Sequence, residues 1–153
     1  MANLRAAIKA DRHTVAIAIF SGIQLVHVQA RKLASDASRS ERSALAFINR
    51  VLEAFPANAV TIESAPEHTQ RSKLISQVAA CLKSDNRSIE FVDPRLVIES
   101  FCFPVVRKRH EVRKIVRDIW PVLVIRNGSP LELDAAALGL YIQVEHLLSL
   151  NSS

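Results

Sequence analysis

Three acidic residues stand where the sequence predicts the ends of secondary-structure elements. Asp11 closes a first apolar segment, Glu63 ends the segment Ala59–Glu63, and Asp134 lies about one turn into the final predicted helix. Carboxylates that gather at one site repel each other unless a proton or a cation neutralises them. Their hard oxygen atoms suit Mg²⁺ or Mn²⁺. Two such ions can activate water and stabilise the leaving oxygen in phosphodiester cleavage.

These three residues are therefore the candidate catalytic and metal-binding set. Taken singly, each also has an ordinary explanation. Asp11 is a typical turn residue, and Asp134 is an acid in the first turn of a helix, where the helix dipole favours negative charge. The five histidines are dispersed and lack the spacing of zinc ligands, so we expect no zinc site.

A second group of candidate residues is basic and precedes Asp134. Six basic residues fall on one predicted helix: Arg107, Lys108, Arg109, Arg113, Lys114 and Arg117. Arg109, Arg113 and Arg117 follow at i, i+4 and i+8, so they form one stripe. The stripe fits contact with backbone phosphates, and it equally fits a solvated helix face.

The hydrophobic pattern predicts the elements that would position these residues. Alternating apolar residues predict strands over Leu4–Ala10, Thr14–Phe20, Ile23–Val28, Ala59–Glu63 and Ser88–Val92. Helical spacing and start signals predict five helices: from the capping box at Ser38 to before Pro56, over Gln70–Lys83, from Pro94 to Phe101, over Val106–Trp120, and from Ser129 to Leu148.

This order predicts an α/β fold with a mixed five-stranded sheet flanked by helices. Three antiparallel strands come first, and strand–helix–strand units follow. In such sheets, sites form at the carboxyl ends of strands. The small residues Ala135, Ala136, Ala137 and Gly139 would let the last helix lie close to the sheet and bring Asp134 to the strand ends.

Composition limits the class of protein. The 153 residues predict a single domain over 1–153, and 49% hydrophobic with 23% charged residues excludes a disordered chain and a disulfide scaffold. Twenty basic against 15 acidic residues give a net charge of +5, which suits a polyanionic partner. Cys81 and Cys102 stand in apolar stretches and indicate buried, reduced thiols and a cytoplasmic protein.

Other features argue against a membrane, a leader or a small-molecule cofactor. No apolar run approaches the length of a membrane span, roughly 18 residues. Asp11 and the polar residues Ser21, Gln24 and His27 interrupt the N-terminal apolar run, so we expect no signal peptide. A glycine-rich phosphate loop and a dinucleotide-binding motif are absent from the sequence.

The acidic residues resemble, in order and spacing, those of RuvC-type Holliday-junction resolvases of the ribonuclease H-like superfamily. The matching segments are Ala7–Ala16 around Asp11, Ile62–Ala65 around Glu63, Ser72–Leu82, Phe91–Val97, Arg107–Val112 and Asp134–Leu138. The resemblance covers nearly the whole chain. Arg109 stands where that family usually has a lysine.

The chain departs from the family pattern at two places near the acids. Arg12 and His13 follow Asp11, where the family usually has proline and glycine, although either residue could contact phosphate. Leu131 stands where the family has a fourth acid, three residues before Asp134. Glu132 is nearby, but its spacing from Ser129 assigns it to the capping box.

The resemblance implies an endonuclease that cleaves phosphodiester bonds of branched DNA with Mg²⁺ or Mn²⁺ held by Asp11, Glu63 and Asp134. It also implies a homodimer, because a four-way junction presents two symmetric strands. Arg12, Arg107, Lys108, Arg109 and Arg113 would bind the DNA backbone. The departures leave two alternatives open: an inactive nucleic-acid-binding or assembly module, and an RNA-processing nuclease of the same superfamily.

Overall fold

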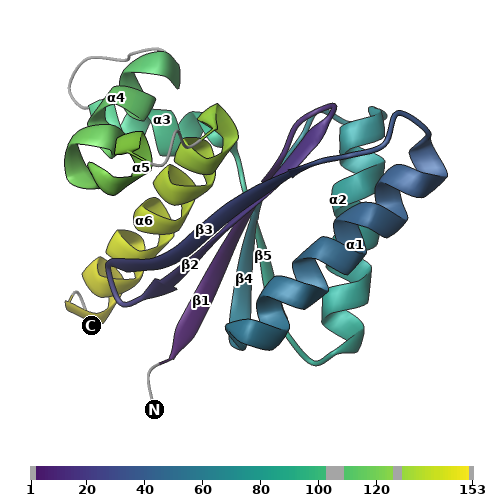
Figure 1. Cartoon of the computed structure of the whole chain (residues 1–153). Coiled ribbons are helices and arrows are strands. Elements are labelled where there is room, and N and C mark those ends of the chain that lie inside the picture. The colour runs from purple at the N-terminus through teal and green to yellow at the C-terminus, as the bar shows by residue number, and fades with distance from the viewer. Residues whose placement is uncertain (1–2, 103–108, 126–128, 152–153) are drawn as a thin grey trace.

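A mixed five-stranded sheet forms the centre of the computed structural model, which describes residues 3–102, 109–125 and 129–151 (Figure 1). Its strands are β1 (Leu4–Ala10), β2 (Thr14–Ser21), β3 (Gln24–Lys32), β4 (Ala57–Glu63) and β5 (Ser88–Val92). Their spatial order is β3-β2-β1-β4-β5. The pairs β1–β2 and β2–β3 are antiparallel, and β1–β4 and β4–β5 are parallel. The predicted sheet is confirmed.

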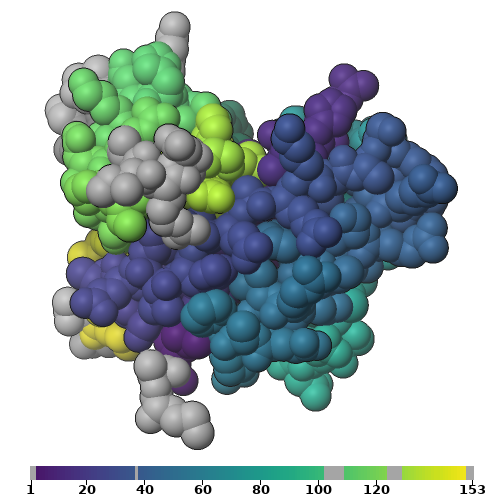
Figure 2. All heavy atoms as spheres, in the orientation of Figure 1, coloured from purple at the N-terminus to yellow at the C-terminus, as the bar shows by residue number. Residues whose placement is uncertain are grey.

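Helices cover both faces of this sheet (Figure 1). One face carries α1 (Ala37–Ala54) and α2 (Gln70–Ser84). The other carries α6 (Pro130–Asn151), with α3 (Pro94–Cys102), α4 (Arg109–Ile119) and the short α5 (Val122–Ile125) packed around it. Each face has its own buried apolar core. Figure 2 shows that the lobe of α4 and α5 (green) and the lobe of α1 (blue) stand apart at the top of the view, near the β1–β2 turn (purple).

The pleat of the two central strands decides which side chains face α6. Ile8 on β1 and Ile62 on β4 are register partners, and both enter the core beneath α1 and α2. Successive side chains of a strand alternate between faces. The next residues, Lys9 and Glu63, therefore both point to the α6 face, side by side on neighbouring strands.

The starts of the first two helices correct and extend the sequence prediction. A capping box at Ser38 is wrong by two residues: the N-cap is Asp36, whose side chain accepts from the backbone N–H of Ser38 at 3.1 Å. Aspartate is a strong N-cap, because its carboxylate accepts from N–H groups that the helix leaves unpaired. The α2 helix has a reciprocal capping box between Thr69 and Ser72 that the sequence analysis did not identify.

The remaining differences are small. The basic helix begins at Arg109 within the described residues, and the predicted start at Val106 lies outside them. The four-residue α5 was not predicted. Cys81 has a free thiol and is only half-buried, because the inner face of α2 is formed by its neighbours. In the described part of the chain, no helix has the length and hydrophobicity that crossing a membrane requires.

Close contact between α6 and the sheet depends on small side chains. Ala135, Ala136 and Ala137 are fully buried in the core between the sheet and the helices around α6. Gly139 lies directly over the ring of Phe20 on β2, and a Cβ atom at this position would overlap that ring. Phe20 is itself held by an edge-to-face contact with Trp120, with ring centroids 5.8 Å apart.

We predict that Gly139→Ala destabilises the protein by about 1–3 kcal/mol, because the confined Phe20 ring must move. At an open position inside a helix, the same change stabilises by about 1 kcal/mol. Whether Gly139→Ala lowers or raises the stability of the protein therefore tests whether the α6 backbone lies against the Phe20 ring. Urea denaturation monitored by circular dichroism measures it, and an increase in stability would contradict the prediction.

Candidate active site

The three predicted acids lie at the ends of β1 and β4 and in the first turns of α6. Asp11 follows the last residue of β1 and organises the turn into β2. Its Oδ1 accepts the backbone N–H groups of His13 and Thr14, each at 2.8 Å. These bonds stabilise the turn that the family pattern would form with glycine. Asp11 is thus a turn residue. It also lies at the same end of the sheet as Glu63, because β1 and β4 are parallel and Glu63 is the last residue of β4.

Glu63 is a buried carboxylate with two cationic partners. Its side chain has no exposed surface, and its Oε1 accepts from Lys9 Nζ at 2.9 Å. Arg109 Nη2 donates to the same oxygen. Its second oxygen, Oε2, is buried and has no hydrogen-bond partner among the described residues. A carboxylate oxygen in this position is available to a further ligand.

Asp134 is held by a two-pronged contact from α4. Arg113 donates from Nε to Oδ1 and from Nη2 to Oδ2, each at 2.8 Å, while the Asp134 side chain is 2% exposed. Arg109 Nη1 lies 3.8 Å from Asp134 Oδ1, an ion-pair distance that is too long for a hydrogen bond. The single guanidinium of Arg109 therefore spans Glu63 and Asp134.

The electrostatic field of all three acids reaches Arg113. The hydrogen bonds to Asp134 raise the pKa of Arg113 above its usual value, against the opposing effect of desolvation. The charges of Asp134, Asp11 and Glu63 raise this pKa further. The charge of Asp11 thus acts on the same guanidinium that binds Asp134.

In this arrangement Lys9, Arg109 and Arg113 neutralise Glu63 and Asp134 by direct ion pairs. Within the described residues, no three acidic, histidine or cysteine side chains are grouped as ready metal ligands. The donor chemistry nevertheless fits a hard divalent cation: two carboxylates already share one cationic group, and Glu63 Oε2 is unpartnered. A metal ion would therefore compete with the basic side chains.

The predicted basic residues divide into three groups. Arg109 and Arg113 face the acids, whereas Arg117 on the same helix is exposed. Arg107 and Lys108 lie outside the described residues. Arg12 is exposed beside Asp11. Contact of these side chains with DNA stays a prediction.

Two further residues complete the picture. Leu131, at the position of the missing fourth acid, is 5% exposed and packs in the core around α6, so it supplies no ligand.

Lys9 was not predicted from the sequence as a site residue, although it pairs with the predicted site residue Glu63. The signal was a lone charge in the apolar strand Ala6–Ala10, two residues before Asp11.

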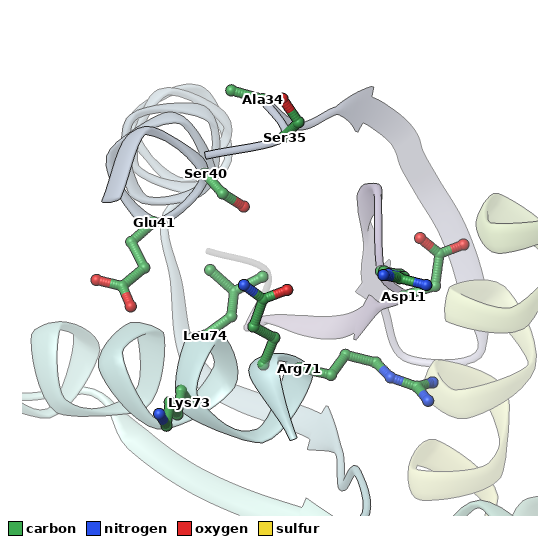
Figure 3. Close-up of a pocket in the computed structure, with 10 residues that line it drawn as sticks. Asp11, Ala34, Ser35, Ser40, Glu41, Arg71, Lys73 and Leu74 are labelled. Carbon is green, nitrogen blue, oxygen red and sulfur yellow. The ribbon is translucent and has the colours of Figure 1, made fainter. Parts of the chain in front are cut away.

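A pocket of about 130 Å³ adjoins Asp11 on the side of the sheet that carries α1 and α2 (Figure 3). It lies between the β1–β2 turn and the first turns of α1 and α2. Arg12, Arg71 and Lys73 line it, together with the acidic residues Asp11 and Glu41. Figure 3 shows the Arg71 side chain extending from α2 toward the side of the pocket where Asp11 lies.

Comparison with solved structures identifies the fold. Thermus thermophilus RuvC is similar with a TM-score of 0.74 and 18% identity, over 94% of this chain and 96% of that one. The yeast mitochondrial Holliday junction resolvase is similar with a TM-score of 0.64 and 14% identity, over 95% and 82%. Fowlpox virus resolvase, in complex with substrate Holliday junction DNA, gives 0.60 and 16%, over 96% and 98%.

The chain therefore has a ribonuclease H-like fold. More narrowly, its arrangement is that of RuvC-type Holliday junction resolvases over nearly the whole length, as the resemblance in the sequence implied. No protein-family model and no curated protein matches the sequence.

We predict that Arg113→Met destabilises the protein by about 2–3 kcal/mol, because the buried Asp134 carboxylate loses two charge-assisted hydrogen bonds. Arg117→Met is the matched control: it removes the same charge from an exposed position on α4 and should change stability by less than about 0.5 kcal/mol. Thermal and urea unfolding measure both variants. Equal destabilisation by the two substitutions would refute the structural role of the Arg113–Asp134 pair.

Proposed function

We propose that this protein is a divalent-metal-dependent endonuclease that cleaves phosphodiester bonds of branched DNA. The observation that carries the proposal is the shared guanidinium: Glu63 and Asp134 both lie within ion-pair distance of Arg109, beside Asp11 at the edge of the sheet. A metal ion binds its oxygen ligands at about 2.0–2.6 Å, so these carboxylates would draw closer together around the ion once Arg109 has left them. The similarity to resolvase structures supports branched DNA as the substrate.

Glu63, Asp134 and Asp11 would hold Mg²⁺ or Mn²⁺. When bound, such an ion supplies positive charge to the scissile phosphate and lowers the pKa of a water molecule. The chain's own residues then have separate tasks. Glu63 and Asp134 orient the site from a rigid strand and helix, and Asp11 keeps the β1–β2 turn in place through its Oδ1. Arg109 and Arg113 stabilise negative charge near the reacting phosphate.

The pocket beside Asp11 supports a path for the DNA backbone. Arg12, Arg71 and Lys73 give it a net positive lining, and the first turns of α1 and α2 border it. A backbone phosphate suits this combination. Arg107 and Lys108 precede α4 in the sequence and would extend the basic surface.

The active form would be a homodimer in the cytoplasm. A four-way junction presents two strands related by symmetry, and two copies of one site can address both. The net charge of +5 favours association with such a polyanion.

A second candidate function is a junction-binding module without nuclease activity. Two observations favour it: Glu63 and Asp134 are already paired with Lys9, Arg109 and Arg113, and Leu131 supplies no fourth ligand. Such a module would bind DNA with strong salt dependence and leave it uncut at every Mg²⁺ or Mn²⁺ concentration. An RNA substrate is the remaining alternative, which parallel assays with junction, duplex and RNA would resolve.

We predict that Asp11→Asn abolishes Mn²⁺-dependent nicking of a synthetic four-way junction while the fold is retained. The amide side chain preserves an acceptor for the turn and removes the negative charge needed to hold a cation. Asp118→Asn, at an exposed carboxylate of α4, is the matched control and should nick at the wild-type rate. Unchanged nicking by Asp11→Asn would refute the proposal, and binding without cleavage by the wild type would favour the second candidate.

We predict that Arg71→Gln weakens junction binding and lowers the salt dependence of binding by about one ion, because one phosphate contact is lost. Arg50→Gln is the control, since Arg50 is exposed on α1 and lines a different hollow, near β3. Fluorescence anisotropy at a series of salt concentrations measures both. If the two variants have the same salt slope, the DNA backbone does not enter the pocket beside Asp11.

A further inference from the structure

We propose that Lys9 is a built-in cation of the catalytic cluster that takes the place of a second divalent ion. The cluster would then accept one metal ion per chain where a two-metal phosphodiesterase holds two. Lys9 would act as a positioning residue, because it acts through Glu63. The inference rests on the proposed function and specifies the metal requirement of that same site.

The location of Lys9 fixes its ammonium group beside Glu63. It lies on β1, the central strand, which is paired on both sides by β2 and β4. Its neighbours Ile8 and Ala10 are buried, and its side chain is 11% exposed. The ammonium is 2.9 Å from Glu63 Oε1, within a direct ion pair. A lysine so enclosed has little room to move away from Glu63 while the strand remains in the sheet.

Arg109 and Arg113 differ from Lys9 in this respect. They reach the acids from α4, and their side chains are 21% and 30% exposed. Long side chains on a helix surface can change rotamer and present their guanidinium groups to a phosphate. Lys9 is therefore the cation that stays when DNA phosphates engage the two arginines.

Charge balance then determines how many metal ions the cluster accepts. With both arginines turned to phosphate, Asp11, Glu63 and Asp134 carry three negative charges and Lys9 one positive charge. A single divalent ion neutralises the remainder, whereas two would leave an excess of positive charge among buried groups. Leu131 faces the apolar core and adds no fourth carboxylate. The presence of Lys9 and the absence of a fourth carboxylate thus both lower the negative charge of the cluster, and with it the number of metal ions that the cluster accepts.

The unpartnered Oε2 of Glu63 marks where the single ion would bind. Lys9 and Arg109 both occupy Oε1, and Oε2 is buried without a partner among the described residues. Glu63 would therefore divide its two oxygens between a fixed ammonium group and a metal ion.

The test counts the Mn²⁺ ions bound to the full chain in complex with a four-way junction that has non-cleavable linkages, after subtraction of the Mn²⁺ bound by the junction alone. Electron paramagnetic resonance of free Mn²⁺ and titration calorimetry give the count. Wild type should bind one Mn²⁺. Lys9→Met should bind the first Mn²⁺ at least about tenfold more tightly, because a like charge has left the site, and should accept a second. Lys9→Arg, which keeps the charge, should bind one Mn²⁺ with wild-type affinity.

Lys83→Met, which removes an exposed charge at the end of α2, should also match the wild type. Circular dichroism and thermal unfolding establish that each variant is folded. Lys9→Gln repeats the test with a side chain that can still donate a hydrogen bond to Glu63, in case Lys9→Met does not fold.

Wild-type stoichiometry and affinity in both uncharged variants would overturn the proposal, as would two Mn²⁺ ions in the wild type or none in any protein. Failure of the proposed function looks different. In that case the wild type leaves junction, duplex and RNA uncut, while the difference in Mn²⁺ binding between Lys9→Met and Lys9→Arg is still present.

Discussion

The burial of Glu63 between the sheet and α6 is the constraint to which the rest of the site responds. A carboxylate with no exposed surface costs several kcal/mol unless it is paired and hydrogen-bonded. Lys9 satisfies it from the adjacent strand, and Arg109 satisfies it from α4. Arg109 and Arg113 in turn fix Asp134. Helix α4, which shares only a modest apolar face with the rest of the molecule, is thereby connected to the sheet through charge.

Close packing of α6 is the second requirement, because it brings the Asp134 side chain to the strand ends. Ala135, Ala136 and Ala137 supply no bulk that would hold the helix away, and Gly139 lets its backbone lie against the Phe20 ring. A helix displaced by one larger side chain would separate Asp134 from Glu63. The apolar core of α6 and the ionic cluster at its start are therefore mutually dependent: packing sets the distance, and charge pairing sets the orientation.

Much of this could be predicted from the sequence, and the remainder has a physical explanation. Alternation and helical spacing predicted every strand and the long helices, because these patterns express the burial of one face. The trio Asp11, Glu63 and Asp134 followed from element ends. The Lys9–Glu63 pair did not, since it depends on the register between β1 and β4, which no local pattern records. The N-cap of α1 at Asp36 was missed because Ser38, two residues later, also has the spacing of a capping box with Glu41.

The acid trio and the basic stripe were separate features in the sequence, and the structure joins them. Arg109 and Arg113 are not free cationic groups on a solvated helix face. Arg109 is paired with Glu63, and Arg113 is paired with Asp134. A guanidinium that moves from a carboxylate to a phosphate exchanges one anion for another, so the exchange costs far less than breaking an ion pair into an apolar environment. Phosphate entering the site therefore competes for the same arginines that neutralise Glu63 and Asp134. In the proposed function Lys9 stays on Glu63 during that exchange, so it limits the negative charge exposed when the arginines leave. DNA binding and metal binding at this site would then be electrostatically coupled.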